Sequence, residues 1–249
     1  MNVDPVIVFD GVGKTFSLAL HLAGGVKGLL LQPRRALQRM HAARRECLRD
    51  ISFEIARGES VAIIGRNGVG KSTILSLIAG VLAPTSGRVS VRGRVSPLLE
   101  LGAGFHPELS GRDNILLNGV LLGMRRAEVR RKAADIIAFA ELEDSIDEPI
   151  RVYSSGMLAR LGFAVAVHLD PEILLVDESL AVGDERFQQK CIRQIGDLHS
   201  RGVTTVLVSH DLLSVSLLCQ RALVLEAQKI AYSGPVEDAI RFYKSGNSQ

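Results

Sequence analysis

The chain has 249 residues, of which 47% are hydrophobic and 23% charged, a composition that excludes a disordered chain and is typical of a globular protein. Its net charge is +3, but residues 27–49 carry seven basic side chains and one acid, so this segment is +6 and the rest of the chain is −3. The basic character is therefore local and does not indicate a general nucleic-acid-binding surface. No apolar stretch reaches the roughly 20 residues of a transmembrane helix, the N-terminus lacks the layout of a secretory signal, and three cysteines without CxxC or metal spacing indicate reduced thiols of the cytosol.

Short strands and one helix are expected in the first hundred residues. The apolar pattern predicts strands over residues 6–9, 51–55, 60–64 and 88–92, and a helix over residues 72–82. Turn residues Pro84 and Gly87 end that helical unit. A segment of about residues 17–46 interrupts the pattern with a glycine pair, a proline and most of the basic run.

The second half begins as a block of helices and then alternates strands with helices. Residues 111–168 are expected to be mostly helical, and Ser110–Asp113 resembles a capping box at their start. Individual elements are expected over residues 125–139, 155–168, 173–176, 185–200, 204–208 and 212–218, followed by a hairpin of residues 223–226 and 229–232 and a helix over 236–244. A helical block inserted into an alternating framework predicts an α/β core with a helical subdomain.

The strongest motif follows the expected strand of residues 60–64. It matches GxxxxGK[ST], the phosphate-binding loop whose backbone N–H groups surround the phosphates and whose helix adds its positive end. Lys71 is expected to reach the β- and γ-phosphates, and the Ser72 hydroxyl is expected to ligate Mg2+. The nucleotide-binding residues predicted from this motif are Gly65, Arg66, Asn67, Gly68, Val69, Gly70, Lys71, Ser72 and Thr73.

Two adjacent carboxylates end the apolar strand of residues 173–176. Asp177 is expected to hold the Mg2+ shell, and Glu178 to act as the general base that polarises the attacking water. Acids also follow strands at helix N-caps, so the pair is weak evidence when taken alone. Its place after a phosphate-binding loop favours the catalytic interpretation.

Two further segments carry small or polar residues at element ends. Tyr153–Met157 opens a helix whose N-terminal dipole could face a phosphate, although a plain serine cap explains these five residues better on their own. His210 follows the strand of residues 204–208 and could hydrogen-bond the γ-phosphate, although a lone histidine is more often structural. Its position one strand after Asp177 favours the functional interpretation.

In this order the motifs resemble those of the ABC ATPase family over nearly the whole chain. In that family two subunits pack head to tail around two ATP molecules, and an LSGGQ motif of one subunit caps the γ-phosphate held by the other. By this resemblance Ser154, Ser155 and Gly156 match that motif, and Asp184 belongs to the D-loop that links the two sites. Phe16 matches the aromatic residue that stacks on adenine, or is equally a core residue.

The departures from the family pattern point to a subfamily. No glutamine occurs between Gln38 and Gln188, so the switch-loop position that usually carries one is assigned to Glu100, a carboxylate that can still coordinate Mg2+. The segments around Glu100, residues 153–157 and residues 180–184 together resemble the ATP-binding subunits of O-antigen, capsule or teichoic acid exporters. Because the chain stops soon after its last expected helix, it resembles the short form without a C-terminal carbohydrate-binding domain.

A basic stretch such as residues 27–49, called the basic segment below, is also found in such subunits. It is either a solvated helix face or a surface that attracts anionic headgroups or a lipid-pyrophosphate substrate, at about 1 kcal/mol per basic residue. Under the second hypothesis, neutralising Arg34, Arg35, Arg44 and Arg45 lowers export and spares ATP hydrolysis.

The resemblance implies a single ABC ATPase domain over residues 1–249, with a P-loop core, an antiparallel β part and a helical subdomain of about residues 105–168. It implies an ATPase that uses ATP and Mg2+ to export lipid-linked polysaccharide. The expected assembly is a homodimer beneath two copies of a separate permease, peripheral on the cytoplasmic face of the inner membrane, without nucleic acid.

Three alternatives are weighed against this interpretation. An ABC ATPase for another cargo, such as a lipid or a drug, is opposed only by the subfamily resemblance. A non-transport ABC ATPase acting on nucleic acid is favoured only by the basic segment. A P-loop kinase is disfavoured by the pair Asp177–Glu178 and the late His210.

Overall fold

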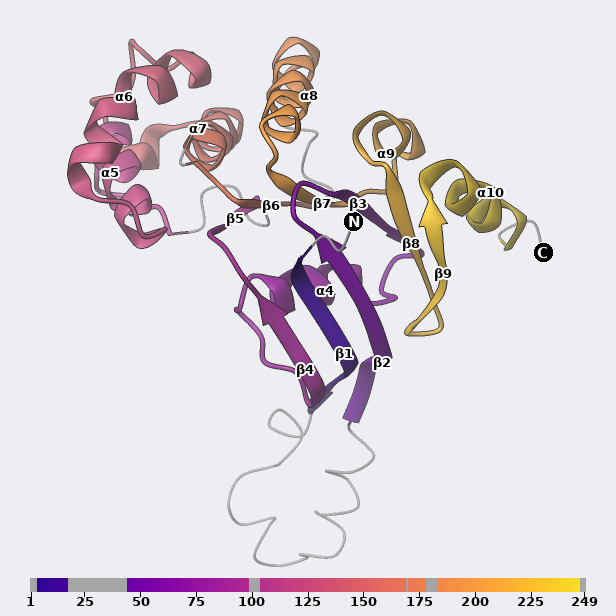
Figure 1. The fold of residues 1–249 in the computed structure, drawn as a ribbon. Helices are drawn as coiled ribbons and strands as arrows, with labels where there is room; N and C mark the ends of the chain where they lie inside the picture. Colours follow the sequence, from indigo (N-terminus) through magenta and orange to yellow (C-terminus); the bar gives the residue numbers. More distant parts are fainter. Residues whose placement is uncertain (1–3, 18–43, 99–103, 169, 178–182, 247–249) are drawn as a thin grey trace, which may run out of the picture.

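Two β-sheets with a helix between them form the centre of the computed structural model (Figure 1). The structure describes residues 4–17, 44–98, 104–168, 170–177 and 183–246. The predicted residues Glu100 and Glu178, together with most of the basic segment, lie outside these ranges. The α/β class expected from the sequence is confirmed.

The smaller sheet is antiparallel, as the resemblance implied. It contains β1 (Pro5–Ser17), β2 (Arg44–Ala56) and β4 (Ser86–Val91) in the order β2-β1-β4. Phe9 and Phe53 stack across the first pair with ring centroids 4.5 Å apart, which is the aromatic cross-strand pairing that stabilises sheets. Both β1 and β2 are 13 residues long and so extend well beyond the predicted strands.

The larger sheet has six strands and carries the C-terminal half of the core. Its order is β5 (Val95–Leu98), β6 (Ile173–Val176), β7 (Thr204–Val208), β3 (Ser60–Gly65), β8 (Arg221–Glu226) and β9 (Lys229–Pro235). Neighbours are parallel except in the hairpin of β8 and β9, which confirms the expected hairpin. The sequence did not predict β5, because it is short and contains Pro97; a proline is tolerated there since β5 lies at the sheet edge.

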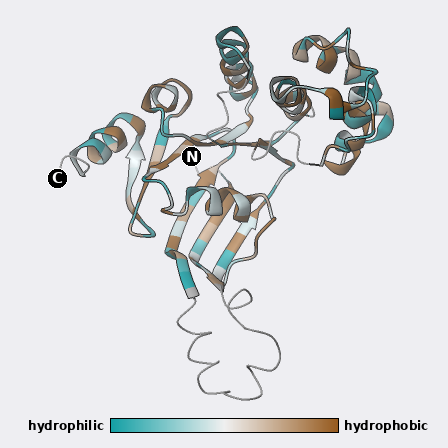
Figure 2. Ribbon diagram, turned by 180° about the vertical axis from the view of Figure 1, so that it is seen from behind, coloured by the Kyte–Doolittle hydropathy of each residue, from teal (hydrophilic) through white to brown (hydrophobic). Residues whose placement is uncertain are grey.

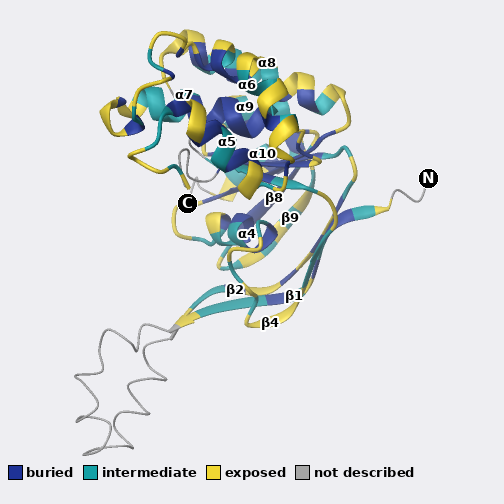
Figure 3. Cartoon of the chain, turned by 90° about the vertical axis from the view of Figure 1, so that its left-hand side faces the viewer, coloured by how far each residue is buried: buried dark blue, intermediate teal, exposed yellow. Residues whose placement is uncertain are grey.

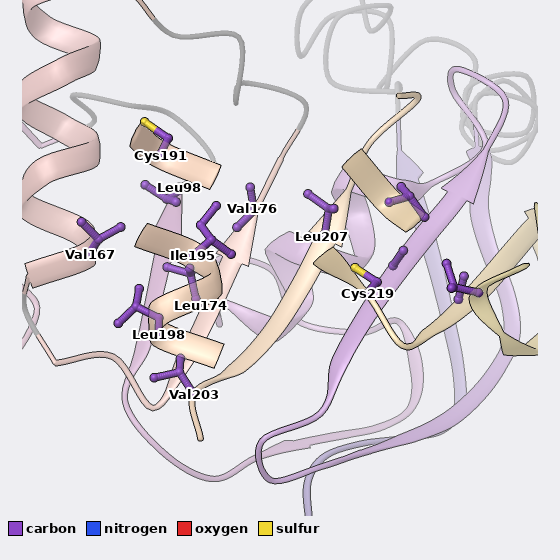
Figure 4. Packing of buried hydrophobic residues seen from close by; sticks show 14 of the residues in the cluster. Leu98, Val167, Leu174, Val176, Cys191, Ile195, Leu198, Val203, Leu207 and Cys219 are labelled. Carbon is purple, nitrogen blue, oxygen red and sulfur yellow. The ribbon is translucent and has the colours of Figure 1, made fainter. Parts of the chain in front are cut away.

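The central strands β6, β7, β3 and β8 of the larger sheet are buried on both faces, with successive residues pointing to opposite sides. On one face, Val61 and Ile63 of β3 pack toward α4 (Lys71–Ile78) and the smaller sheet. On the other face, Ala62 and Ile64 join the cluster beneath the remaining helices, part of which is drawn in Figure 4. Figure 3 shows that burial concentrates in these strands and in the inner sides of the helices. The helices on this second face are α7 (Ser155–His168), α8 (Glu185–Ser200), α9 (Leu212–Leu218) and α10 (Val236–Gly246).

A separate helical block lies at one end of the larger sheet (Figure 1). It contains α5 (Gly111–Leu121), α6 (Arg126–Ala140), the short η1 (Ile150–Val152) and α7, which share a hydrophobic cluster of their own. The hydroxyl of Ser110 accepts a hydrogen bond from the backbone N–H of Asp113 at 3.1 Å and donates to its carboxylate at 2.7 Å, so Ser110 caps α5 as one half of the expected capping box. Hydrophobic and hydrophilic residues both occur along these helices in Figure 2.

The three cysteines are free thiols, which agrees with the sequence expectation. Burial raises the pKa of Cys191 and of Cys219 to about 12, so both thiols stay protonated and unreactive near neutral pH. Cys47 on β2 is only partly buried. Among the described helices, none combines the length and the apolar character that crossing a bilayer requires.

Substitution by alanine is expected to affect stability differently at two helical glycines, one tightly packed and one open to solvent. A Cβ on Gly119 of α5 would lie 2.4 Å from Cγ2 of Val129, a buried and stiff side chain of α6, whereas nothing lies within 4 Å of a Cβ on the exposed Gly196 of α8. Gly196→Ala is expected to raise the free energy of unfolding by about 1 kcal/mol through helix propensity. Gly119→Ala has the same propensity gain but adds an overpacking cost, so it should be less stable than Gly196→Ala by about 1–3 kcal/mol in urea unfolding. Equal stabilities would contradict this account of the α5–α6 contact.

Candidate functional site

The glycine-rich loop Gly65–Thr73 connects β3 to α4 and is fitted closely against neighbouring strands. A Cβ on Gly65 would lie 2.5 Å from the carbonyl oxygen of Leu225 on β8. Gly70 caps α4 with φ 113°, and a Cβ there would lie 2.7 Å from the carbonyl oxygen of Cys47 on β2. At both positions only glycine fits, so the packing of two strands fixes the path of the loop.

Lys71 begins α4 and is held over this loop. Its side chain is 6% exposed, and its ammonium group donates hydrogen bonds to the carbonyl oxygens of Gly65 at 2.9 Å and Arg66 at 3.2 Å. The amine therefore lies inside the turn of the loop, at the N-terminal end of α4. An anion placed on the loop would meet this amine together with the helix N-terminus.

A cavity of about 380 Å³ opens at the loop. Its lining residues are Arg45, Cys47, Asn67, Gly68, Gly70, Lys71, Ser72 and Thr73. Five of the predicted loop residues besides Lys71 thus face one space. Sequence reasoning missed Cys47 as a lining residue and placed Arg45 in the basic segment, because only the packing of β2 against the loop brings them beside residues about twenty positions away along the chain.

The carboxyl ends of three parallel strands bring the other predicted residues to the same edge. Val208 at the end of β7 lies opposite Ile63 of β3, and β6 ends level with Leu207. The loop follows β3, half-buried Asp177 follows β6, and exposed His210 comes two residues after β7. This edge therefore collects a phosphate-type loop, a carboxylate and an imidazole, whereas Glu178 lies outside the described residues.

The segment Tyr153–Met157, called the serine-rich segment below, lies at the start of α7 and faces another cavity, of about 370 Å³. The hydroxyl of Ser154 accepts a hydrogen bond from the backbone N–H of Met157 at 3.2 Å and thereby caps the helix. Ser155 is exposed and Gly156 is half-buried. Ser154 and Gly156 line this second cavity with Arg160 and Gly183. The segment is thus accessible at a place separate from the loop cavity of its own chain.

Asp184 joins two helices near that second cavity. Its carboxylate accepts a hydrogen bond from the backbone N–H of Phe187 at 2.9 Å, which caps α8, and it pairs with Arg160 of α7 at 2.8 Å. The hydrogen bond from Phe187 and the charge of Arg160 hold the pKa of Asp184 below its ordinary value. Arg160 also pairs with Glu141 at 3.3 Å and lies 5.0 Å from the ring centroid of Phe187. Sequence reasoning missed Arg160, which ties the serine-rich helix to the start of α8.

Phe16 is a surface residue of β1, so the interpretation of it as a core residue is wrong. It is 36% exposed, and the ammonium group of Lys14 lies 5.1 Å from its ring centroid. Its partner across the strand pair is Arg45, whose side chain therefore lies on the same face of the sheet. An exposed ring beside a lining residue of the loop cavity suits stacking with a planar ligand.

A magnesium ion is chemically compatible with this edge. Ser72 lines the cavity, and Asp177 directly follows β6, the strand that neighbours β7. Mg2+ is commonly held by one or two carboxylates together with phosphate oxygens and water. In the described part of the chain no group of three or more His, Cys, Asp or Glu residues could hold a metal ion.

Comparisons with known proteins agree with this geometry. Residues 48–181 match the family described as ABC transporter. The chain is 50% identical over 242 residues to the O-antigen export system ATP-binding protein RfbB of Klebsiella pneumoniae, covering 97% of this chain and 98% of that one. It is 40% identical over 237 residues to the teichoic acids export ATP-binding protein TagH of Listeria innocua, covering 95% and 69% of the two chains.

Solved structures share the fold at low sequence identity. An ATP-binding subunit of an ABC transporter superposes with a TM-score of 0.76 at 20% identity, covering 96% of this chain and 93% of that one. A dimeric ATP-binding cassette in a post-hydrolysis state with ADP and Pi superposes with a TM-score of 0.73 at 22% identity, covering 92% and 98%.

Proposed function

The chain belongs to the ABC transporter family, and on that premise we propose that it is the ATP-hydrolysing subunit of an exporter of lipid-linked polysaccharide. The observation that carries the ATPase part is the meeting of the glycine-rich loop, Asp177 and His210 at one edge of the parallel sheet. The cargo is supported by the relatives named for O-antigen and teichoic acid export, which align along 97% and 95% of this chain.

The loop and Lys71 bind the phosphates. The backbone N–H groups at the start of α4 face the β-phosphate, and the amine of Lys71 exchanges the carbonyl oxygens of Gly65 and Arg66 for β- and γ-phosphate oxygens. The ring of Phe16 stacks on the adenine. These contacts fix the nucleotide with its γ-phosphate toward Asp177 and His210.

Hydrolysis then needs a base and charge stabilisation. Glu178 takes the proton of the attacking water, and His210 donates a hydrogen bond to the γ-phosphate. Ser72 and Asp177 are the residues that would hold Mg2+, with Glu100 as the switch-loop carboxylate, and the ion would neutralise charge on the β- and γ-phosphates.

The serine-rich segment acts on the nucleotide of a second copy of the chain. Ser154, Ser155 and Gly156 lie apart from the loop cavity of their own chain, and Ser155 is exposed at the start of α7. In a head-to-tail homodimer they complete the partner site, and the contact of Arg160 with Asp184 holds α7 and the D-loop end together. This dimer binds two copies of a separate permease at the cytoplasmic face of the inner membrane, without nucleic acid.

Deleting the gene in its native host tests the cargo. We expect one surface polysaccharide to disappear while its lipid-linked precursor accumulates inside the cell, as measured by glycan analysis of both fractions. Normal glycans in both fractions would overturn polysaccharide export and leave an ABC ATPase with another cargo.

A further inference from the structure

We propose that Arg45 is a second cation for the polyphosphate of the bound nucleotide, acting beside Lys71. This inference rests on the proposed ATPase function and adds a residue outside the phosphate-binding loop. Arg45 lies on β2, yet it lines the same cavity as Gly68, Lys71 and Thr73. Its Nη2 atom lies 3.8 Å from the position that a Cβ on Gly68 would occupy.

The packing of β2 against the loop places Arg45 beside Gly68. Cys47, two residues further along β2, lines the same cavity, and its carbonyl oxygen contacts the position of a Cβ on Gly70. Arg45 and Cys47 therefore both belong to the wall of the cavity at the loop. Across the strand pair, Phe16 lies opposite Arg45. A nucleotide whose adenine stacks on Phe16 therefore extends past Arg45 toward the loop.

The positive charges that line the loop cavity favour the binding of an anion. In the part of the chain that the structure describes, Arg45 makes no ion pair and no hydrogen bond, and the neighbouring Glu46 is engaged by Arg49 at 2.8 Å. The described lining residues include two cations, Arg45 and Lys71, and no carboxylate. A planar guanidinium with several N–H donors is well suited to phosphate oxygens.

Binding measurements on the purified chain test this assignment. Wild type, Arg45→Ala, Arg45→Lys and Arg88→Ala are titrated with ATP, ADP and inorganic tripolyphosphate by isothermal calorimetry. Arg88 is an exposed arginine of β4 in the same sheet and serves as the matched control. Arg45→Ala is expected to weaken all three ligands about tenfold, because one charge-assisted hydrogen bond is lost. Arg45→Lys should recover part of the loss, and Arg88→Ala should bind like wild type.

Steady-state kinetics distinguish an effect of Arg45 on ATP binding from an effect on the hydrolysis step. If Arg45 contacts the polyphosphate equally before and during hydrolysis, Arg45→Ala raises the KM for ATP and leaves kcat within about twofold. Unchanged affinity in Arg45→Ala overturns the proposal. So does a loss for ATP without a loss for tripolyphosphate, which would assign Arg45 to the nucleoside, or an equal loss in Arg88→Ala. A wild-type chain that binds no ATP would instead overturn the proposed function.

Discussion

Glu178→Gln is expected to abolish ATP hydrolysis while ATP binding is retained. Glu178 follows Asp177 at the carboxyl end of β6, where the amide would keep the shape of the side chain but could not accept the proton of the attacking water. Loss of a general base costs roughly 10²–10⁴-fold in rate. The measurement is release of phosphate at saturating ATP, together with the Kd for ATP of the same preparation.

The same variant reports on assembly. With hydrolysis blocked, ATP should hold two copies of the chain together, so Glu178→Gln with ATP is expected to elute as a dimer in size-exclusion chromatography. Asp113→Asn is a suitable control, because this carboxylate only supports the cap of α5. Hydrolysis in Glu178→Gln within tenfold of wild type would assign the base to another residue.

Lys71→Met is expected to lower ATP hydrolysis at least about a hundredfold and also to weaken ATP binding. The thioether fills the space of the lysine stem, but the positive charge now held by the carbonyl oxygens of Gly65 and Arg66 is lost. Removing one preorganised donor to a transition state typically costs about 10²–10³-fold. Lys229→Met, on the exposed hairpin strand β9, is the control for loss of a lysine elsewhere. Wild-type turnover in Lys71→Met would contradict the role of the loop.

Local pattern was enough to predict most elements of the larger sheet and its helices. The bounds of α7, β6, α8, β7 and α9 agree with those expected from the sequence, because each is a strongly patterned run ended by turn residues or caps. The helix expected over residues 72–82 ends earlier, at Ile78, where Gly80 with φ 72° lies just beyond the C-cap Ala79. The full length of β1 and β2 depends on their pairing with each other, which the sequence of either strand does not reveal.

The residues of the candidate site likewise fall into those that local motifs predict and those that depend on contacts between distant segments. The loop, Asp177 and His210 were predicted because contiguous motifs and the rule for parallel strands place them together. Arg45 and Arg160 were missed because their importance comes from contacts between segments far apart in the chain. Arg45 reaches the loop only through the packing of β2, and Arg160 meets Asp184 only where α7 crosses the start of α8.

Arg45 belongs both to the basic segment and to the wall of the loop cavity. Neutralising four arginines together, Arg45 included, is now expected to weaken nucleotide binding as well as any contact with headgroups. A test of the membrane hypothesis should therefore keep Arg45 and change only Arg34, Arg35 and Arg44, whose side chains lie outside the described structure.

The most direct test of the central claim is complementation of the gene deletion with hydrolysing and non-hydrolysing forms of the chain. Wild type, Glu178→Gln and the surface control Arg92→Ala would be expressed at matched levels, and surface polysaccharide and intracellular lipid-linked precursor would be quantified. The account predicts that wild type and Arg92→Ala restore the surface polysaccharide, while Glu178→Gln leaves it absent and the precursor retained. Restoration by Glu178→Gln to the wild-type level, with its ATP hydrolysis abolished in vitro, would contradict the claim that hydrolysis by this chain drives export.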